Sequence, residues 1–234
     1  MIWVGTSGYD YPEWKGSFYP ADLPAAKRLP YYAERFSTVE INYSFYRLPS
    51  EKTFGEWAQL AFNPFSFTLK APRRITHEAR LQNCEDLLNT FCTRAQSLGP
   101  KLGILLFQLP PWFRKNIPVL NAFTSLLPNG IRAAFEFRHE SWYSDDIFLL
   151  LEDRGFALCI TDSEDIKTPL VMTADYAYFR LRDEGYQESD IARWANSIKQ
   201  HTASLKDTFV YFKHEEEGKG PEFAQLLRAH LERG

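Results

Sequence analysis

The sequence predicts a TIM-type (β/α)8 barrel, formed as a single domain over residues 1–234. Short apolar runs alternate with segments of helical periodicity, which favours a parallel sheet covered by helices. The length of 234 residues also suits one such barrel. Seven of the apolar runs end on a charged or strongly polar side chain, as expected where parallel strands build a site at one mouth: "TVEIN", "FSFTLK", "GILLFQ", "RAAFEFR", "ALCITD", "AYFRLR" and "TFVYFKHE".

Eight strands are expected in order along the chain. The first opens the sequence in "MIWVGTSGYD", and the other seven are the runs quoted above. Each is a short apolar stretch of strand-like residues, and each is followed by a segment of different periodicity. The expected strands begin near Ile2, Val39, Phe65, Leu102, Ala133, Ala157, Ala177 and Phe209.

Helices are expected between these strands and after the last one. Pro49 and Ser50 mark the start of the second helix, and Gly220 followed by Pro221 marks the start of the last. The interval 163–176 holds a proline and little amphipathic pattern, so the sixth helix is expected to be shortened or missing. The remaining helices are expected around 27–35, 51–61, 84–98, 117–127, 145–154, 188–201 and 221–232.

Charge and hydropathy exclude several classes of partner. The formal net charge of −3 is too small to suggest non-specific binding to nucleic acid or to an acidic membrane. The N-terminus lacks a basic region followed by a long apolar run, and no segment has the roughly 20 apolar residues of a membrane span. We therefore expect a cytoplasmic protein without a membrane partner, whose oligomeric state the sequence leaves open.

Alternation along the strands predicts a cluster of polar side chains at one mouth of the barrel. Residues two apart share a face, so Glu136 and Arg138 point together while Phe135 and Phe137 face the helices. An unpaired charge facing the apolar helix layer is costly, so the charged members should face the barrel axis or its mouth. This mouth cluster comprises Glu40, Asn42, Thr68, Lys70, Gln108, Glu136, Arg138, Asp162, Arg180, Arg182 and Lys213.

The mouth cluster carries an excess of positive charge. Cations packed into a cleft favour an anionic ligand, phosphate above all. Alternatively, the three arginines neutralise the three carboxylates as structural ion pairs that line the barrel. The formal charge of +2 comes from five basic and three acidic members: Lys70, Arg138, Arg180, Arg182 and Lys213 against Glu40, Glu136 and Asp162.

Aromatic side chains and histidines supplement the mouth cluster. Rings beside a cationic mouth suit stacking on a base or sugar, and Tyr43, Tyr46 and Trp142 are the candidates nearest to it. His77 and His139 follow the third and fifth strands, where a catalytic acid or base would lie.

A divalent metal is possible but not favoured, and the cofactor is left open. Glu40, Glu136, Asp162 and His139 could together hold a metal ion. The crowd of lysines and arginines around them argues against it, so no metal ligand is predicted.

Five strings carry a resemblance to a known family: "GTSGYDYPEWKGSFYP", "TVEINYSFYRLPS", "LKAPRRITHEARL", "LGILLFQLPP" and "AFEFRHESW". They resemble the domain of unknown function 72 family, also called YecE-like, from about Val4 to Leu231. The resemblance implies a TIM-type barrel with a pocket at its C-terminal face, and it implies no particular reaction. The strings around Arg182 and Lys213, "RLRDEGY" and "YFKHEEEGKGPEFA", depart from a common family form and are like a shorter variant. The family pattern falls on Glu40, Asn42, Tyr46, Lys70, His77, Gln108, Glu136, Arg138, His139 and Trp142, among others.

The leading functional hypothesis is an enzyme that acts on a phosphorylated, ring-bearing ligand, such as a nucleotide, a nucleic-acid end or a sugar phosphate. Lys70, Arg138 and Arg180 would hold the anion, and Glu136 or His139 would move protons. The predicted catalytic residues are Glu40, Lys70, Glu136 and His139. The predicted ligand-binding residues are Asn42, Tyr46, His77, Gln108, Arg138, Trp142, Asp162, Arg180, Arg182 and Lys213.

Three alternatives remain open at this point. A non-enzymatic nucleotide or nucleic-acid binder would use the same cations and rings. A glycosidase would need two suitably spaced carboxylates, for which Glu40 and Glu136 are available. A Schiff-base lyase would use Lys70 or Lys213, because neighbouring arginines depress the pKa of a lysine.

Overall fold

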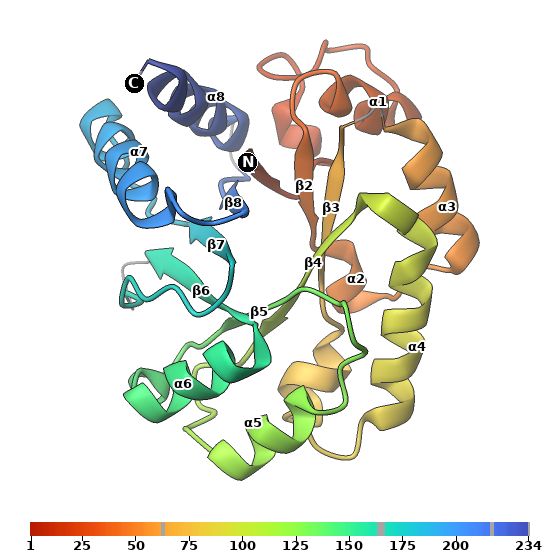
Figure 1. Cartoon of the computed structure of the whole chain (residues 1–234). Coiled ribbons are helices and arrows are strands. Elements are labelled where there is room, and N and C mark those ends of the chain that lie inside the picture. Colours follow the sequence, from red (N-terminus) through yellow and green to blue (C-terminus); the bar gives the residue numbers. More distant parts are fainter. Residues whose placement is uncertain (62–63, 163–166, 216–217, 234) are drawn as a thin grey trace.

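The computed structural model describes residues 1–61, 64–162, 167–215 and 218–233. Within these ranges eight parallel strands form a closed barrel in chain order, with β8 paired back to β1 (Figure 1). The predicted TIM-type barrel is confirmed. The strands are β1 (Ile2–Ser7), β2 (Thr38–Ile41), β3 (Ser66–Lys70), β4 (Leu102–Gln108), β5 (Ala133–Glu136), β6 (Ala157–Asp162), β7 (Tyr176–Leu181) and β8 (Asp207–Phe212).

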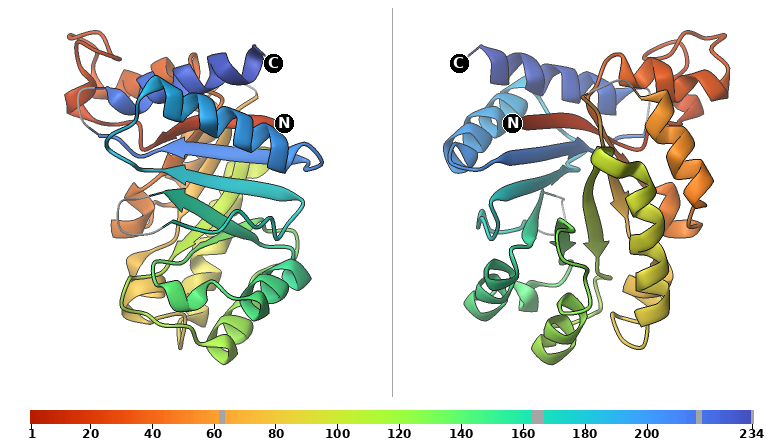
Figure 2. Two further views of the ribbon diagram at one scale, coloured as in Figure 1. Left: turned by 90° about the vertical axis from the view of Figure 1, so that its left-hand side faces the viewer. Right: turned by 45° about the vertical axis from the view of Figure 1, so that its right-hand side comes forward.

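Helices surround the barrel where the periodicity predicted them, with ends shifted by a few residues. Figure 2 shows α7 and α8 side by side, and α8 packs across β8 and β1. The last helix begins at Lys219, two residues before the expected Pro221. The helices are α1 (Arg28–Ala33), α3 (Glu51–Leu60), α4 (Glu85–Ala95), α5 (Ile117–Thr124), α6 (Asp145–Arg154), α7 (Glu188–Thr202) and α8 (Lys219–Glu232).

The connection from β6 to β7 lacks a helix in its described part, residues 167–175. The surrounding helices are accordingly interrupted between α6 and α7 (Figure 1). This agrees with the expected shortened or missing sixth helix, although residues 163–166 of that interval lie outside the described residues.

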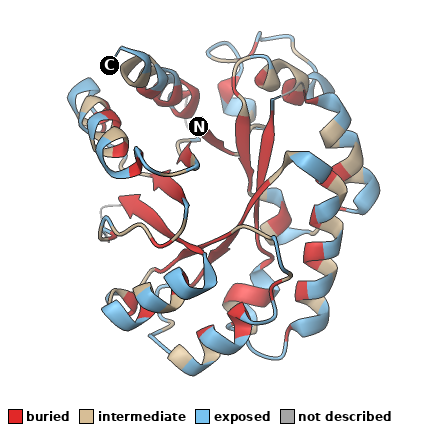
Figure 3. Cartoon of the chain, viewed as in Figure 1, coloured by how far each residue is buried: buried red, intermediate tan, exposed pale blue. Residues whose placement is uncertain are grey.

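The strands are buried on both faces, whereas the helices expose their outer sides (Figure 3). Ile104, Leu106, Cys159 and Tyr178 belong to a cluster that fills the barrel interior. The intervening residues, such as Phe135, pack in the larger cluster under the helices. Successive residues of a strand therefore point in turn to the barrel interior and to the helices. For a polar residue at the end of a strand, its place in this alternation decides whether it faces the interior or the helices.

Two short elements that periodicity did not predict follow β2 and β3. A helical turn, α2 (Tyr43–Tyr46), and a π-helical turn, η3 (Arg74–Glu78), lie between the strands and the larger helices α3 and α4. The chain leaves η3 through Arg80, Leu81 and Asn83, all with positive φ. These turns carry aromatic and imidazole side chains to the mouth of the barrel.

Gly5 is required by a close approach between β1 and β2. A Cβ atom at this position would lie 2.1 Å from the Thr38 carbonyl oxygen. The absence of a side chain here lets β1 bring Ser7 into register with Glu40 of β2.

No helix in the described part of the chain is both long and apolar enough to cross a membrane.

Candidate functional site

The carboxyl ends of the strands bring most of the mouth cluster together. Glu40, Lys70, Gln108 and Glu136 end or nearly end their strands and are buried. Arg180 lies one residue before the end of β7 and is 1% exposed. The other cations of the cluster lie one or two residues after the ends of three strands and are partly exposed: Arg138, Arg182 and Lys213.

Arg180 lies between two carboxylates from opposite sides of the barrel. Its Nε is 3.0 and 3.1 Å from the two oxygens of Glu40, and its Nη1 is 3.0 Å from Oε2 of Glu136. Burial alone disfavours a charged guanidinium, but the two carboxylates outweigh burial and raise the pKa of Arg180. This part of the cluster matches the structural ion-pair alternative.

Glu40 has two further partners that the charge pattern of the sequence did not include. The hydroxyls of Ser7 and Tyr178 both donate to its carboxylate. Ser7 also accepts a hydrogen bond from Nδ2 of Asn42 at 2.8 Å. Register could have identified both hydroxyls, because Ser7 is opposite Glu40 and Tyr178 is two residues before Arg180 on the same face.

Glu136 is shared among several cations. Gln108 donates to its Oε1 at 2.8 Å, and the side chains of Arg182 and Arg138 approach the same oxygen at 3.9 and 4.0 Å. Burial works to raise the pKa of Glu136, but the charges of Arg180, Lys70 and the other arginines prevail and lower it. Glu136 is therefore ionised at neutral pH.

Lys70 differs from every other cation of the cluster. It is 9% exposed, and its Nζ lies 4.1 Å from the centre of the Phe45 ring. No described carboxylate lies within 4.0 Å of this amine, and no described residue accepts a hydrogen bond from it. Burial, followed by the charge of Arg180, lowers the pKa of Lys70 to about 7, although Glu136 and Glu40 act in the opposite direction.

His77 contacts the same aromatic ring. Its imidazole packs edge-on against Phe45 at 5.0 Å between ring centres, and its Nδ1 is 2.9 Å from the Thr76 hydroxyl. Burial and the charge of Lys70 lower the pKa of His77 to about 4. The imidazole is therefore neutral at pH 7.

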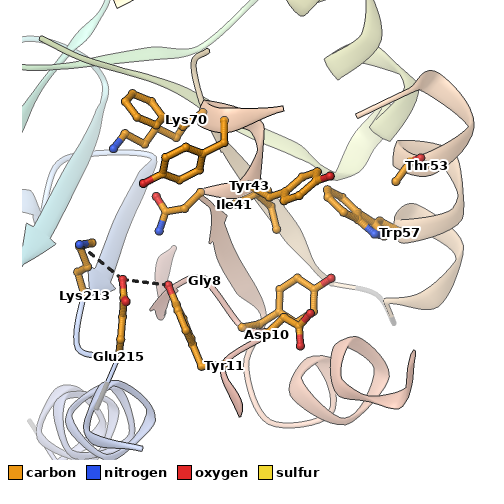
Figure 4. Close-up of a pocket in the computed structure, with 14 residues that line it drawn as sticks. Gly8, Asp10, Tyr11, Ile41, Tyr43, Thr53, Trp57, Lys70, Lys213 and Glu215 are labelled. Carbon is orange, nitrogen blue, oxygen red and sulfur yellow. Dashed lines mark hydrogen bonds and ion pairs between the residues drawn. The ribbon is translucent and has the colours of Figure 1, made fainter. Parts of the chain in front are cut away.

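A cavity of about 650 Å³ extends from the mouth cluster between the β1 loop and α2 and α3 (Figure 4). Figure 4 shows the amines of Lys70 and Lys213 at one end of this mouth cavity and the side chains of Tyr43 and Trp57 at the other. Six of the 14 described residues that line it are aromatic: Tyr9, Tyr11, Tyr43, Phe45, Tyr46 and Trp57.

Some polar groups in the cavity wall have a hydrogen-bond or ion-pair partner, and others do not. Lys213 is 3.6 Å from Glu215, which also accepts a hydrogen bond from Tyr11 at 3.4 Å. Burial, followed by Arg180 and Arg182, lowers the pKa of Lys213. Oδ1 of Asn42, in contrast, is buried without a hydrogen-bond partner in the described residues.

The prediction that Asp162 faces the barrel axis is wrong. Its carboxylate accepts hydrogen bonds from the Arg182 N–H at 3.0 Å, from Nε1 of Trp194 on α7 at 2.9 Å and from the hydroxyl of Tyr186. Asp162 alternates with Thr161, which shares the strand face of Cys159 in the barrel interior. The strand therefore presents Thr161 to the axis.

The charge of the mouth cluster becomes more positive once Asp162 is removed from it. Five cations remain against Glu40 and Glu136, a formal charge of 5 − 2 = +3. Arg180 engages both carboxylates at hydrogen-bond distance. Of the other four cations, Arg138 and Arg182 have only longer approaches to Glu136, Lys213 contacts Glu215, and Lys70 has no described carboxylate within 4.0 Å.

The remaining predicted residues lie in three different environments. Tyr46 lines the mouth cavity and is 80% exposed. Trp142 is buried, stacks on Phe137 and donates from Nε1 to the Phe113 carbonyl at 2.7 Å, so it packs in the core. His139 accepts a hydrogen bond from the Ser141 N–H at 3.1 Å, and no described residue of the mouth cluster is hydrogen-bonded to it.

Among the described residues, no group of three or more His, Cys, Asp or Glu side chains is arranged to hold a metal ion. Glu40 and Glu136 are engaged by Arg180 instead.

Comparison with known proteins gives both close and distant relatives. The UPF0759 protein YecE of Escherichia coli K12 is 31% identical over 172 residues, which cover 71% of this chain and 61% of that protein. The match thus spans about three fifths of the relative's length. The UPF0759 protein YunF of Bacillus subtilis strain 168 is 24% identical over 97% of this chain and 95% of its own length.

Solved structures with the same fold are also known. A DUF72 family protein from Thermotoga maritima superposes with a TM-score of 0.90 at 26% identity over 99% of both chains. A DUF72 family protein from Enterococcus faecalis V583 gives 0.83 at 19% identity over 99% of this chain and 96% of that one, which supports the fold alone. The family model described as "Protein of unknown function DUF72" matches residues 3–234. Because that match covers nearly the whole sequence, the chain belongs to the DUF72 family.

Proposed function

We propose that this protein is an enzyme that binds a phosphorylated ligand with a sugar or base ring, holding the phosphate at the mouth cluster and the ring in the mouth cavity. The observation that carries this proposal is Lys70, a nearly buried amine without an anionic partner among the described residues, located where the cationic cluster meets the aromatic cavity. A desolvated cation without a counter-ion is unfavourable, and a phosphate oxygen would supply the missing partner.

Several cations are available to the phosphate besides Lys70. Lys213 lines the same cavity, and Arg138 and Arg182 are partly exposed beside Glu136. Because one carboxylate cannot neutralise three arginines, these guanidinium groups retain capacity for a ligand. Arg180 is saturated by Glu40 and Glu136, so we assign it to positioning rather than to anion binding.

The mouth cavity suits the uncharged part of the ligand. Its volume of about 650 Å³ lies in the range of pockets that bind small molecules. Tyr43 and Tyr46 present exposed rings on which a base or sugar can stack. Asn42 also lines the cavity, and its Oδ1 is buried without a hydrogen-bond partner among the described residues.

The group best suited to move protons is Lys70. A catalytic acid or base works best with a pKa near the operating pH, which applies to Lys70 at about 7. Glu136 has a lowered pKa and is bound to Arg180, so in this proposal it stabilises positive charge instead. The same feature disfavours a glycosidase, whose general acid needs a raised pKa.

Non-enzymatic binding of the same ligand is the second candidate. The exposure of Tyr43 and Tyr46, 52% and 80%, favours it, because rings this open can stack on a larger polymer such as single-stranded nucleic acid.

Matched pairs of compounds test the proposed function. Thermal unfolding would be followed with sugars and sugar phosphates, and with nucleosides and nucleotides. We expect the phosphorylated member of a pair to raise Tm and Lys70→Met to weaken its binding by about 10- to 100-fold, because a hydrogen bond to a charged group contributes about 1.5–3 kcal/mol.

Lys206→Met is the control, because Lys206 is 80% exposed and precedes β8 at the opposite end of the barrel. Equal effects of neutral and phosphorylated members, or no effect of either, would contradict phosphate binding. Turnover of a bound ligand that stops in Lys70→Met would favour the enzyme over the non-enzymatic binder, and tight binding of oligonucleotides without turnover would favour the binder.

A further inference from the structure

We propose that Lys70 is a nucleophile that forms an imine with an aldehyde or ketone carbon of the ligand, which makes the substrate a phosphorylated carbonyl compound. This inference rests on the proposed function for the phosphate and adds the covalent step. It concerns one atom, Nζ of Lys70, and the surroundings that prepare it.

The geometry distinguishes Lys70 from the other lysine of the cavity. Lys213 is 3.6 Å from Glu215, so its amine has an anionic partner. Nζ of Lys70 faces the Phe45 ring at 4.1 Å and has no carboxylate within 4.0 Å in the described residues. The amine is also at the cavity wall, where a ligand carbon can reach it (Figure 4).

The electrostatic surroundings support the neutral form that a nucleophilic amine requires. Burial and the charge of Arg180 lower the pKa of Lys70 to about 7. At pH 7 about half of these amines are neutral, against roughly 1 in 2,500 for an ordinary lysine. Desolvated lysines beside another cation are activated for imine formation in this way.

His77 is placed to transfer the protons that the reaction requires. Lys70 and His77 both contact the ring of Phe45, and the charge of Lys70 contributes to the lowered pKa of His77. Nδ1 of His77 is bonded to the Thr76 hydroxyl, and Nε2 has no hydrogen-bond partner among the described residues. A pKa of about 4 keeps this imidazole neutral and able to accept a proton.

The reaction balances with the groups present and one proton from the solvent. The neutral amine of Lys70 attacks the carbonyl carbon, a C–N bond forms, and the π electrons of the carbonyl move to its oxygen. The nitrogen loses a proton to His77 and the oxygen takes one from the solvent, which gives a carbinolamine. The protonated His77 then returns its proton to the hydroxyl, which leaves as water, and a C=N bond remains. The protonated imine keeps one positive charge, which the carboxylates of Glu136 and Glu40 stabilise.

The phosphate explains how such a carbonyl compound would be selected. Arg138 and Arg182 carry guanidinium groups, which stay charged when Lys70 is neutral, so an anion can still bind while the amine reacts. The open-chain form of a sugar phosphate has the required combination of a carbonyl carbon and a phosphate.

The test uses pyridoxal phosphate as a probe, with pyridoxal as the matched compound that lacks the phosphate. Each is incubated with the whole protein, reduced with borohydride, and the modified lysine is located by peptide mass spectrometry. We expect modification of Lys70 by the phosphorylated probe, with an apparent pKa near 7 for the rate. Lys70→Arg should abolish this modification, because a guanidinium does not form the imine.

The outcomes separate the covalent step from phosphate binding. Phosphate-dependent Tm shifts without any reduced adduct on Lys70 would overturn the imine and leave the proposed function intact. Equal modification of Lys70 by both probes would support the imine and count against phosphate recognition. Modification of Lys206 or Lys213 in preference to Lys70 would overturn the assignment of the nucleophile. Slower modification of Lys70 in His77→Asn, with the same final amount of adduct, would support proton transfer by His77.

Discussion

Arg180 is the side chain that organises the centre of the site. One guanidinium holds Glu40 from β2 and Glu136 from β5, so three strands are connected across the barrel interior. Both carboxylates are 0% exposed and would be destabilising without it. The cations at the rim are consequently left without strong anionic partners.

Replacing Arg180 by methionine should destabilise the protein by about 3–5 kcal/mol, because two buried carboxylates lose their counter-charge. Urea unfolding at pH 7 measures the change. The triple variant Glu40→Gln/Glu136→Gln/Arg180→Met removes all three charges and should recover part of the loss. If Arg180→Met were as stable as the original protein, the ion pairs of Arg180 with Glu40 and Glu136 would contribute little to stability.

Glu136→Gln should reduce the sensitivity of folding to acid. The pKa of Glu136 is lowered in the folded state, so its stabilising contribution is present above the ordinary value of 4.5 and is lost as the pH falls through the folded-state value. Urea midpoints from pH 7 to pH 3 should therefore fall less steeply in the variant. Glu152→Gln, at an exposed position of α6, serves as the control and should retain the original slope.

The sequence predicted some of these side chains and missed others for physical reasons. Alternation placed Glu136 and Arg138 together correctly, because their apolar neighbours clearly belong under the helices. It failed for Asp162, because both Thr161 and Asp162 are polar and only the distant donor Trp194 reveals which one faces outward. A contact that spans 32 residues leaves no local pattern.

At the scale of elements, Asp162 connects the end of β6 to β7 and α7. It accepts one hydrogen bond from the backbone of Arg182 and one from Trp194 on α7, in the region where the helical layer is interrupted. Burial raises the pKa of Asp162, so these donors offset a real desolvation cost. The hydrogen bonds of Asp162 thus connect β6 with α7 beside the β6–β7 connection, whose described part has no helix.

Trp194→Phe should therefore lower stability by about 1 kcal/mol through the lost hydrogen bond. Phosphate binding at the mouth should be unchanged, because Trp194 lies outside the cavity. Chemical denaturation and the thermal-shift assay measure the two effects separately. A large loss of ligand affinity would show that the hydrogen bond between Trp194 and Asp162 also positions Arg182.

The elements themselves were predictable to different degrees. Helix α6 was expected over 145–154 and occupies that range, because its apolar period is regular and Gly155 ends it in a left-handed conformation with φ 65°. The turns α2 and η3 were missed, since four or five residues are too short to display a period. These turns nevertheless carry Phe45 and His77 to the site.

At the scale of the molecule, the positive charge at the mouth of the barrel lowers the stability of the ligand-free protein. A chain of net charge −3 concentrates a formal +3 at the mouth of its barrel. Lys70 carries part of this cost, because its ammonium group is desolvated and lacks a described counter-ion. Sites prepared for a ligand often reduce the stability of the free protein.

Lys70→Met should stabilise the ligand-free protein by about 1–4 kcal/mol below pH 7. The folded-state pKa of about 7 lies below the ordinary 10.5, so stability of the original protein rises with pH between these values. The advantage of the variant is therefore greatest below pH 7 and disappears as the pH approaches 10.5. Urea unfolding at a series of pH values measures it, and destabilisation at pH 6 would contradict the expected cost.

The pairing of Arg180 with Glu40 and Glu136 also limits how deeply a ligand can enter. An anion approaching the mouth meets cations at the rim and two fully buried carboxylates beneath them, so repulsion prevents it from moving along the axis. The depth of binding would then be set by charge rather than by shape. Longer ligands would extend sideways over the aromatic wall of the mouth cavity, while their charged ends remain at one level above the barrel.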